Sequence, residues 1–432
     1  MARVRRSGRR GRRFESAISD KMKRLIIFLA ILIHLSFYFS ALKTHHLDVF
    51  FAHGNTHELQ GLDFFQVPSG AYAWLRGGSL TGQLAENTDQ TAYAPFSNNN
   101  VYHPFFTIVL GSILQLFPAE TAFKLWLFFR LLITILLTIL LYKKYRLHKN
   151  FPLAVCLLIA LFPHYLEIWN GQYQFLLDLA IFLILISSLN QHLPSKKTQL
   201  FNGILYACSL LVKPIGLLWV IPLFLKKRYL TLFSGLLIFI AVSLPFAING
   251  DGMYYFANLF NRVNQPIGGP PGIFTLDAIF RHFVALEPYA NLLKIGLAIL
   301  LLGIQIRIKP SFFTSLFMWT SYYLLFYDLV FEYHYTSLAP FLALGFLSQK
   351  TFNKPLVKIS SLSYLLPTPF ILFYLLQIGA EGRFVTDLGW MIMVLFRVIP
   401  LIIINYELIK AKFYSNTDSN DKIADQGKIC LI

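Results

Sequence analysis

A series of apolar segments recurs along most of this chain and constrains its fold more than any other feature. A transmembrane helix needs roughly 17–25 apolar residues, and a helix buried inside a bundle needs fewer. The candidate segments are 25–42, 105–116, 123–142, 153–168, 175–189, 200–211, 215–225, 230–248, 292–306, 312–330, 337–347, 359–378 and 391–409. This pattern predicts an all-α polytopic membrane protein.

The composition supports the same class. Hydrophobic residues make up 56% of the 432 residues and charged residues only 14%, which is about half the charged share of a soluble domain. A water-soluble fold of this kind would expose large apolar patches. Two of the three cysteines lie inside apolar segments, so a disulfide framework cannot form. We therefore exclude a soluble enzyme, a disordered chain and a secreted disulfide scaffold.

The formal net charge of +17 would fit a nucleic-acid-binding protein, but its distribution favours a role in membrane topology. Residues 1–24 are strongly basic and directly precede the first apolar segment. Further basic clusters lie between later segments, at 143–149, 196–197, 226–228, 307–309, 350–358 and 410–412. Basic loops stay on the cytoplasmic side of a membrane. We therefore expect both termini in the cytoplasm, a basic arm that contacts anionic membrane lipids, and no nucleic-acid partner.

This sidedness constrains the number of spans. Thirteen crossings would place the two termini on opposite sides, so one segment must fail to cross. Segment 105–116 is short and is bounded by Pro104 and Pro118, which favours a re-entrant or half helix. We expect a single domain over 25–412 with roughly twelve transmembrane helices, followed by a polar cytoplasmic tail at 413–432.

The predicted outer face carries two long loops, 43–104 and 250–291. The first is acidic, is too long for a simple connector, and holds a helix-like stretch at 64–75 that ends at Gly77–Gly78. We therefore expect the function on this face. The chain contains no Asn-x-Ser/Thr sequon, which favours a bacterial plasma (inner) membrane.

Asp63 is the first candidate for chemistry, because it lies in this loop just before the aromatic stretch. A carboxylate beside aromatic rings at a membrane surface is suited to take a proton from a hydroxyl group, and partial burial raises its basicity. Two alternatives remain open from the residues alone. From its spacing, Asp63 could instead be a helix N-cap, because an aspartate before a helix accepts backbone N–H bonds. Asp48, which is closer to the membrane, is the alternative candidate for the base.

Other polar residues lie where apolar segments meet the outer face. Tyr102 and His103 precede a short segment, and His103 either holds an anionic phosphate or lies at the interface. Asn170 and Gln172 belong to an Asn-Gly-Gln turn, which also fits a simple outer hairpin. Lys213 lies outside the cytoplasmic basic clusters, so it either snorkels to the surface or contacts a buried anion.

Glu332, His334 and Tyr335 form a third group that could bind a sugar or a phosphate, or could belong to an aromatic belt with capping acids. Asp178 lies inside an apolar segment, where an ionisable residue is either functional or a neutral packing group. No Walker motif, dinucleotide fingerprint or metal-binding spacing is present. An ATP-driven pump is therefore disfavoured.

Five motifs follow one another along the chain: GLDFFQVPSGAYAWLRGG at 61–78, VYHPFF at 101–106, NGQYQFLL at 170–177, LLVKPIGLLWVIPLFLKKRY at 210–229 and EYHYTSLAPFL at 332–342. In this order they resemble glycosyltransferase family 87, the polyprenyl-phosphate-mannose-dependent mannosyltransferases of the GT-C superfamily. The Asn-Gly-Gln and Lys-Pro motifs are the most telling. The chain departs from the family at Gln66–Val67, where aromatic residues are common, and at Gln174, which replaces an Asn.

The resemblance implies a GT-C-type bundle and an inverting transferase on the outer face, which moves a hexose, expected to be mannose, from a polyprenyl-phosphate donor to a lipid or glycan acceptor. Asp63 would be the general base. Charge on the phosphate leaving group would be stabilised by His334, His103 or Lys213, with Arg262 a weaker candidate. The remaining substrate-binding candidates are Tyr102, Asn170, Gln172, Glu332 and Tyr335. The donor arrives already activated, so neither a metal nor a nucleotide is required.

Two other functions compete with this interpretation. A transporter or flippase for a lipid-linked sugar explains the apolar segments and Asp178, but it gives no reason for the long acidic first loop. A polysaccharide polymerase or ligase would use outer loops rich in arginine, and the outer arginines here are sparse and scattered.

Overall fold

The computed structural model describes residues 2–47, 60–80, 100–189, 194–213, 215–248, 273–283, 287–327, 329–368 and 387–429. Within these ranges the chain is helical, apart from one isolated antiparallel bridge between Ile273 and Phe331. This confirms the predicted all-α class. The elements in chain order are α1 (Ala2–Phe39), the π-helical turn η1 (Ser40–Thr44), α2 (Leu62–Leu75), α3 (Pro104–Leu114), α4 (Ala119–Tyr145), α5 (Phe151–Ile159), α6 (Pro163–Asn170), α7 (Gln174–Ser188), α8 (Lys196–Val212), α9 (Ile215–Leu218), α10 (Val220–Leu225), α11 (Tyr229–Ile248), α13 (Leu276–Phe283), α14 (Glu287–Ile308), α15 (Phe312–Phe326), the 3₁₀ turn η5 (Glu332–Ser337), α16 (Leu338–Ser348), η6 (Lys350–Asn353), α17 (Pro355–Leu362), η7 (Ser363–Leu365) and α19 (Asp387–Ile429).

Six helical stretches in the described part of the chain are long and apolar enough to cross a membrane: Asp20–Thr44, Ala119–Tyr145, Phe151–Asn170, Tyr229–Ile248, Asn291–Ile308 and Leu388–Phe413. Four shorter apolar helices accompany them: Pro104–Leu114, Gln174–Ser188, Ile215–Leu225 and Phe312–Phe326. These helices support a membrane protein, whereas the number of roughly twelve spans stays a prediction.

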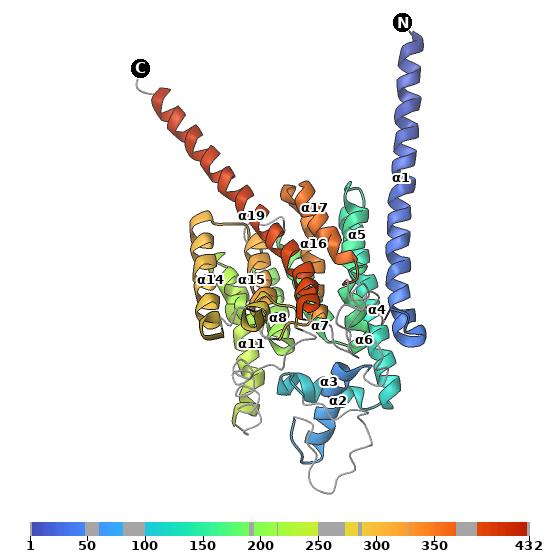
Figure 1. Ribbon diagram of the computed structural model, residues 1–432, viewed down its shortest axis with the longest axis vertical. Helices are drawn as coiled ribbons and strands as arrows, with labels where there is room; N and C mark the ends of the chain where they lie inside the picture. The colour runs from blue at the N-terminus through green and yellow to red at the C-terminus, as the bar shows by residue number, and fades with distance from the viewer. Residues whose placement is uncertain are drawn as a thin grey trace.

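The two ends of the chain leave the bundle on the same side. Figure 1 shows the N-terminal half of α1 and the C-terminal half of α19 projecting from one end, while α2 and α3 lie at the opposite end. This arrangement agrees with the predicted separation of the first loop from both termini. The compartment that each end faces stays a prediction.

The helix α3 corresponds to the segment that was expected not to cross. It begins at Pro104 and has 11 residues, which at about 1.5 Å per residue is far shorter than the hydrocarbon thickness of a bilayer. It packs against α2 at Gly111, where a Cβ atom would come within 2.6 Å of both the Cβ of Ala71 and the carbonyl oxygen of Val67. The two short helices therefore form one unit at the end of the molecule opposite the termini.

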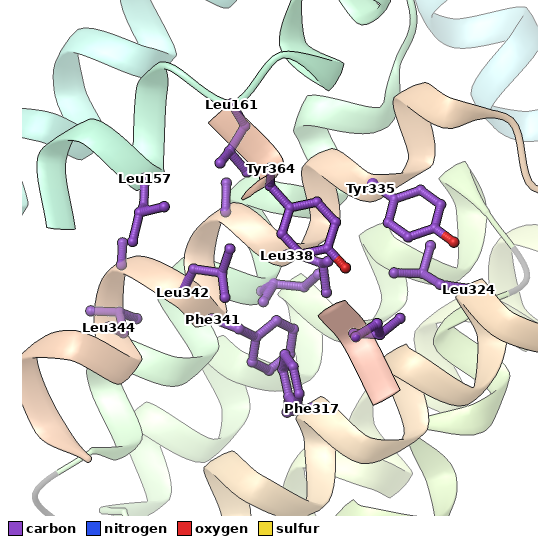
Figure 2. Close-up of a cluster of buried hydrophobic side chains, with 14 of the residues drawn as sticks. Leu157, Leu161, Phe317, Leu324, Tyr335, Leu338, Phe341, Leu342, Leu344 and Tyr364 are labelled. Carbon is purple, nitrogen blue, oxygen red and sulfur yellow. The ribbon is translucent and has the colours of Figure 1, made fainter. Parts of the chain in front are cut away.

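A large apolar core lies behind this unit. Figure 2 shows part of it, with Leu157, Phe317, Phe341 and Tyr364 coming from α5, α15, α16 and η7. In a membrane-embedded bundle, close packing of such side chains holds the helices together, because lipid tails are as apolar as the core itself. The core fixes the position of η5, because η5 continues directly into the buried helix α16.

Candidate active site

Asp63 lies in the first turn of α2. The N-cap of this helix is Gly61, with a φ of 76°, and no side chain caps it. The interpretation of Asp63 as a helix N-cap is therefore wrong. Its carboxylate instead receives hydrogen bonds from Gln66, whose Nε2 is 2.8 Å from Oδ1, and from Nε2 of Gln172, which donates to Oδ2.

The turn between α6 and α7 brings Gln172 to this carboxylate. Gly171 ends α6 with a φ of 63°, and a Cβ atom at this position would lie 2.7 Å from the Cβ of Phe64. Glycine is the residue that accepts both the left-handed conformation and the close approach. The backbone N–H of Gly61 donates to the carbonyl oxygen of Trp169 over 3.1 Å. The turn and the start of α2 are thereby held together.

Two tyrosines complete the polar surroundings. The hydroxyl of Tyr102, just before α3, donates to Oε1 of Gln172 over 3.0 Å, which leaves the amide nitrogen facing Asp63. Tyr333 in η5 hydrogen-bonds the Asp63 carboxylate directly. Both tyrosines are buried. Groups from α2, the α6–α7 turn and η5, which are far apart in sequence, therefore meet at one carboxylate.

A lysine and a histidine lie on the other side of Tyr333. The Nζ atom of Lys213 is 5.1 Å from the centroid of the Tyr333 ring and 2.5 Å from Nε2 of His334. Lys213 follows the end of α8 in an extended conformation, as expected for a residue that precedes a proline. It is buried, so the snorkelling alternative is wrong.

His334 lies between the backbone of Phe331 and the ammonium of Lys213. Its Nδ1 atom is 2.9 Å from the backbone nitrogen of Phe331 and 3.3 Å from the carbonyl oxygen of the same residue. Its Nε2 atom accepts a hydrogen bond from Nζ of Lys213 over 2.5 Å. The ammonium has further N–H groups to donate, so Lys213, held by His334, is chemically suited to bind a phosphate oxygen.

The surroundings raise the pKa of Asp63 to about 6. Loss of solvent around the carboxylate is the largest cause, while the positive charge of Lys213 and the three hydrogen bonds described above oppose it. The residue still keeps part of its surface exposed. A carboxylate of this kind is ionised at neutral pH and is more basic than an ordinary aspartate, as a general base requires.

Three other candidate residues contact different partners. Nε2 of His103 lies 2.9 Å from Oγ of Ser243 in α11. Glu332 forms a buried ion pair with Arg397 of α19. The hydroxyl of Tyr335 donates to a backbone carbonyl just before α13. These contacts place His103, Glu332 and Tyr335 around the cluster at Asp63 rather than in its hydrogen-bond network.

The remaining candidates add no hydrogen bond to the Asp63 network within the described residues, or lie outside them. Asn170 is partly exposed at the end of α6. Arg262 and Asp48 lie outside the residues that the structure describes. Asp178 is buried in α7.

Sequence reasoning missed several residues that the structure brings forward. Tyr333 entered the sequence analysis only as part of the EYHYTSLAPFL motif, and Gln66 only as a departure from the family pattern. Arg130 and Arg397 were overlooked, although each lies inside a predicted apolar span. A charged residue at that position is costly and is a functional candidate by default, so the signal was present.

The fold is that of an all-helical membrane protein, and the cluster at one end of it contains a carboxylate, a lysine and an imidazole, which are the groups of an acid–base enzyme. The chain belongs to glycosyltransferase family 87, whose model matches residues 100–321, just over half of its length. It is therefore a membrane glycosyltransferase. No curated protein and no solved structure matches the chain. The matched range includes Gln172 and Lys213, whereas Asp63 and His334 lie outside it.

Proposed function

We propose that this protein transfers a hexose, with mannose the expected sugar, from a polyprenyl-phosphate donor to a hydroxyl group of a lipid or glycan acceptor, with inversion at the anomeric carbon. The observation that carries the proposal is the contact network of Asp63, in which a carboxylate with a raised pKa interacts electrostatically with Lys213, and Lys213 is hydrogen-bonded to His334. The site lies at the end of the molecule opposite both termini (Figure 1), which supports a reaction on the outer face of a bacterial plasma membrane.

In this reaction the Asp63 carboxylate accepts the proton of the acceptor hydroxyl. The acceptor oxygen forms a bond to the anomeric carbon of the donor, and the bond between that carbon and the phosphate oxygen breaks. The electron pair of the broken bond stays on the polyprenyl phosphate. Gln66 and Gln172 each donate to one carboxylate oxygen, so the base is held in a fixed orientation before substrate binds.

Lys213 and His334 would stabilise the phosphate as it gains charge. Both are buried, and a buried ammonium that a histidine holds in place stabilises a developing negative charge more strongly than an ammonium in water. The rings of Tyr333 and Phe331 stack on each other with centroids 5.6 Å apart beside this pair. An apolar wall of this kind limits the access of water, which would otherwise compete with the acceptor.

A donor assay tests the proposal. Purified protein in proteoliposomes is given radiolabelled polyprenyl-phosphate-mannose and a glycolipid or glycan acceptor extract, with polyprenyl-phosphate-glucose and GDP-mannose as matched donors. We expect label to move to the acceptor from a polyprenyl-phosphate sugar, and the product to have the opposite anomeric configuration. Transfer from GDP-mannose alone, or movement of the intact lipid-linked sugar across the bilayer without transfer, would refute it.

The raised pKa of Asp63 predicts the pH dependence of this transfer. Below pH about 6 the carboxylate is protonated and cannot accept the proton, so kcat/KM should fall about tenfold per pH unit. The donor is a phosphodiester that stays ionised over this range, so it does not contribute to the slope. The profile is measured from pH 4.5 to 8 in proteoliposomes. A kcat/KM that stays level from about pH 7 down to about 5, as an aspartate with the ordinary pKa of about 4 would give, would contradict the assignment.

A further inference from the structure

The turn η5 carries Tyr333 and His334, and its first residue, Glu332, is fixed by an arginine from the last helix. Nη2 and Nε of Arg397 lie 2.5 and 2.8 Å from Oε1 of Glu332. The hydroxyl of Thr368 contacts the same oxygen. Arg397 is 0% exposed and Glu332 is 4% exposed, so solvent does not screen this ion pair.

Arg397 also binds the chain that leads out of α17. Its Nη2 donates to the carbonyl oxygen of Leu366 over 2.9 Å, and its own carbonyl oxygen accepts the hydroxyl of Tyr364 over 2.7 Å. Arg397 therefore connects α19, the end of η7 and the start of η5 in one buried network.

The helix α19 also holds η5 indirectly, because it binds the segment before α13 and that segment binds η5. Nε1 of Trp390 donates to the carbonyl oxygen of Ile273 over 3.1 Å. The next residue, Phe274, donates its N–H to the carbonyl oxygen of Val330 over 2.7 Å and accepts the hydroxyl of Tyr335 over 2.8 Å. The turn is thus bound on both flanks to groups that α19 holds.

A buried ion pair is a poor way to gain stability, because removing two charges from water costs about as much as their attraction returns. Its geometry, however, is directional: both guanidinium contacts fix one carboxylate oxygen. We propose that Arg397 is a positioning residue, which acts through Glu332 to keep the Tyr333 hydroxyl on Asp63 and the His334 imidazole at Lys213. This inference rests on the proposed function of Asp63 as the base.

The inference predicts a specific kinetic signature. The hydrogen bond from Tyr333 favours the charged form of Asp63, so a displaced η5 would raise the pKa of this carboxylate further. The acid limb of the kcat/KM profile should then move to higher pH. A loss of stability alone lowers the amount of folded enzyme without moving this midpoint.

The test compares Arg397→Lys and Arg397→Gln with a matched control on the same helix. Glu407 of α19 forms an ion pair with Lys354, at the start of α17, over 2.6 Å, and Glu407→Gln breaks it without touching η5. Thr368→Val is a milder variant that removes one contact to Glu332 and keeps the arginine. For each folded variant, the pH profile of transfer and the hydrogen exchange of the backbone amides at 329–338 are measured.

We expect Arg397→Gln to lower kcat about tenfold, with a larger effect than Arg397→Lys, to move the acid midpoint up by about half to one pH unit, and to speed exchange at 329–338. Thr368→Val should shift the acid midpoint and the exchange at 329–338 in the same direction but by less, and Glu407→Gln should change neither the midpoint nor the exchange. Wild-type exchange and an unmoved midpoint in the folded Arg397 and Thr368 variants, with an active wild type, would overturn the inference alone. A wild type that transfers no sugar would instead overturn the proposed function, and the inference with it.

Discussion

Replacing Asp63 by Asn should reduce sugar transfer by a factor of about 10²–10⁴. The amide has nearly the same shape as the carboxylate, but it cannot accept the proton of the acceptor hydroxyl. Gln66 and Gln172 each donate to one carboxylate oxygen, and the NH₂ group that replaces one of these oxygens cannot accept such a hydrogen bond. The rate is measured with saturating polyprenyl-phosphate sugar. We expect the KM for the donor to change little, because the loss lies in the proton transfer rather than in donor binding.

Two matched variants show whether this effect is specific. Glu120→Gln makes the same carboxylate-to-amide change on the exposed start of α4, where Glu120 forms an ion pair with Lys124, and it should leave the rate unchanged. Asp48→Asn tests the remaining alternative for the base. Full transfer by Asp63→Asn, or a loss confined to Asp48→Asn, would show that residue 63 is not the base.

The elements around the site could be predicted from local sequence. The aromatic stretch after Asp63, with its glycine stop, predicted a helix over 64–75, and the structure has α2 over Leu62–Leu75. Pro104 predicted the start of the next short helix, and α3 begins there. These features depend on local backbone preferences that proline and glycine determine directly.

The meeting of these elements could not be predicted in the same way. Gln172 and Asp63 are 109 residues apart, and His334 and Lys213 are 121 apart. Local propensity carries no information about such contacts, because they depend on how helices pack. The capping interpretation of Asp63 failed for a local reason instead, because α2 begins at Leu62 and its N-cap is Gly61. The family resemblance grouped these distant motifs into one expected site, because it matched their order along the chain. It did not describe the contacts between them.

The buried arginines show a related limit. Arg130 and Arg397 lie inside apolar segments of the sequence but were overlooked there, and local sequence could not have revealed their partners. In the structure each is paired with a glutamate, Glu167 and Glu332, that lies close in sequence to a residue of the Asp63 network. These two arginines therefore do not belong to the Asp63 network themselves, and each pairs with a glutamate near a residue of that network.

The second large effect that we expect concerns the pair formed by Arg130 and Glu167, in α4 and α6. Nη2 of Arg130 is 2.6 Å from Oε2 of Glu167 and 3.0 Å from Nδ1 of His164, and Nη1 donates to the hydroxyl of Tyr38 over 3.0 Å. Arg130 is 1% exposed and Glu167 is 0% exposed. Arg130→Met would leave a buried carboxylate without its cation, which typically costs about 3–5 kcal/mol. The melting temperature of the purified protein should fall by about 5–10 °C.

The double variant Arg130→Met/Glu167→Met separates the loss of an attraction from the burial of an unpaired charge. It removes both charges and fills the space with apolar side chains of similar length, so it should recover at least half of the lost melting temperature. Lys124→Met, on the exposed part of the same helix, should change the melting temperature little, because its pair with Glu120 is exposed to solvent. Equal losses in the single and double variants would show that Arg130 stabilises α4 and α6 by packing rather than by pairing with Glu167.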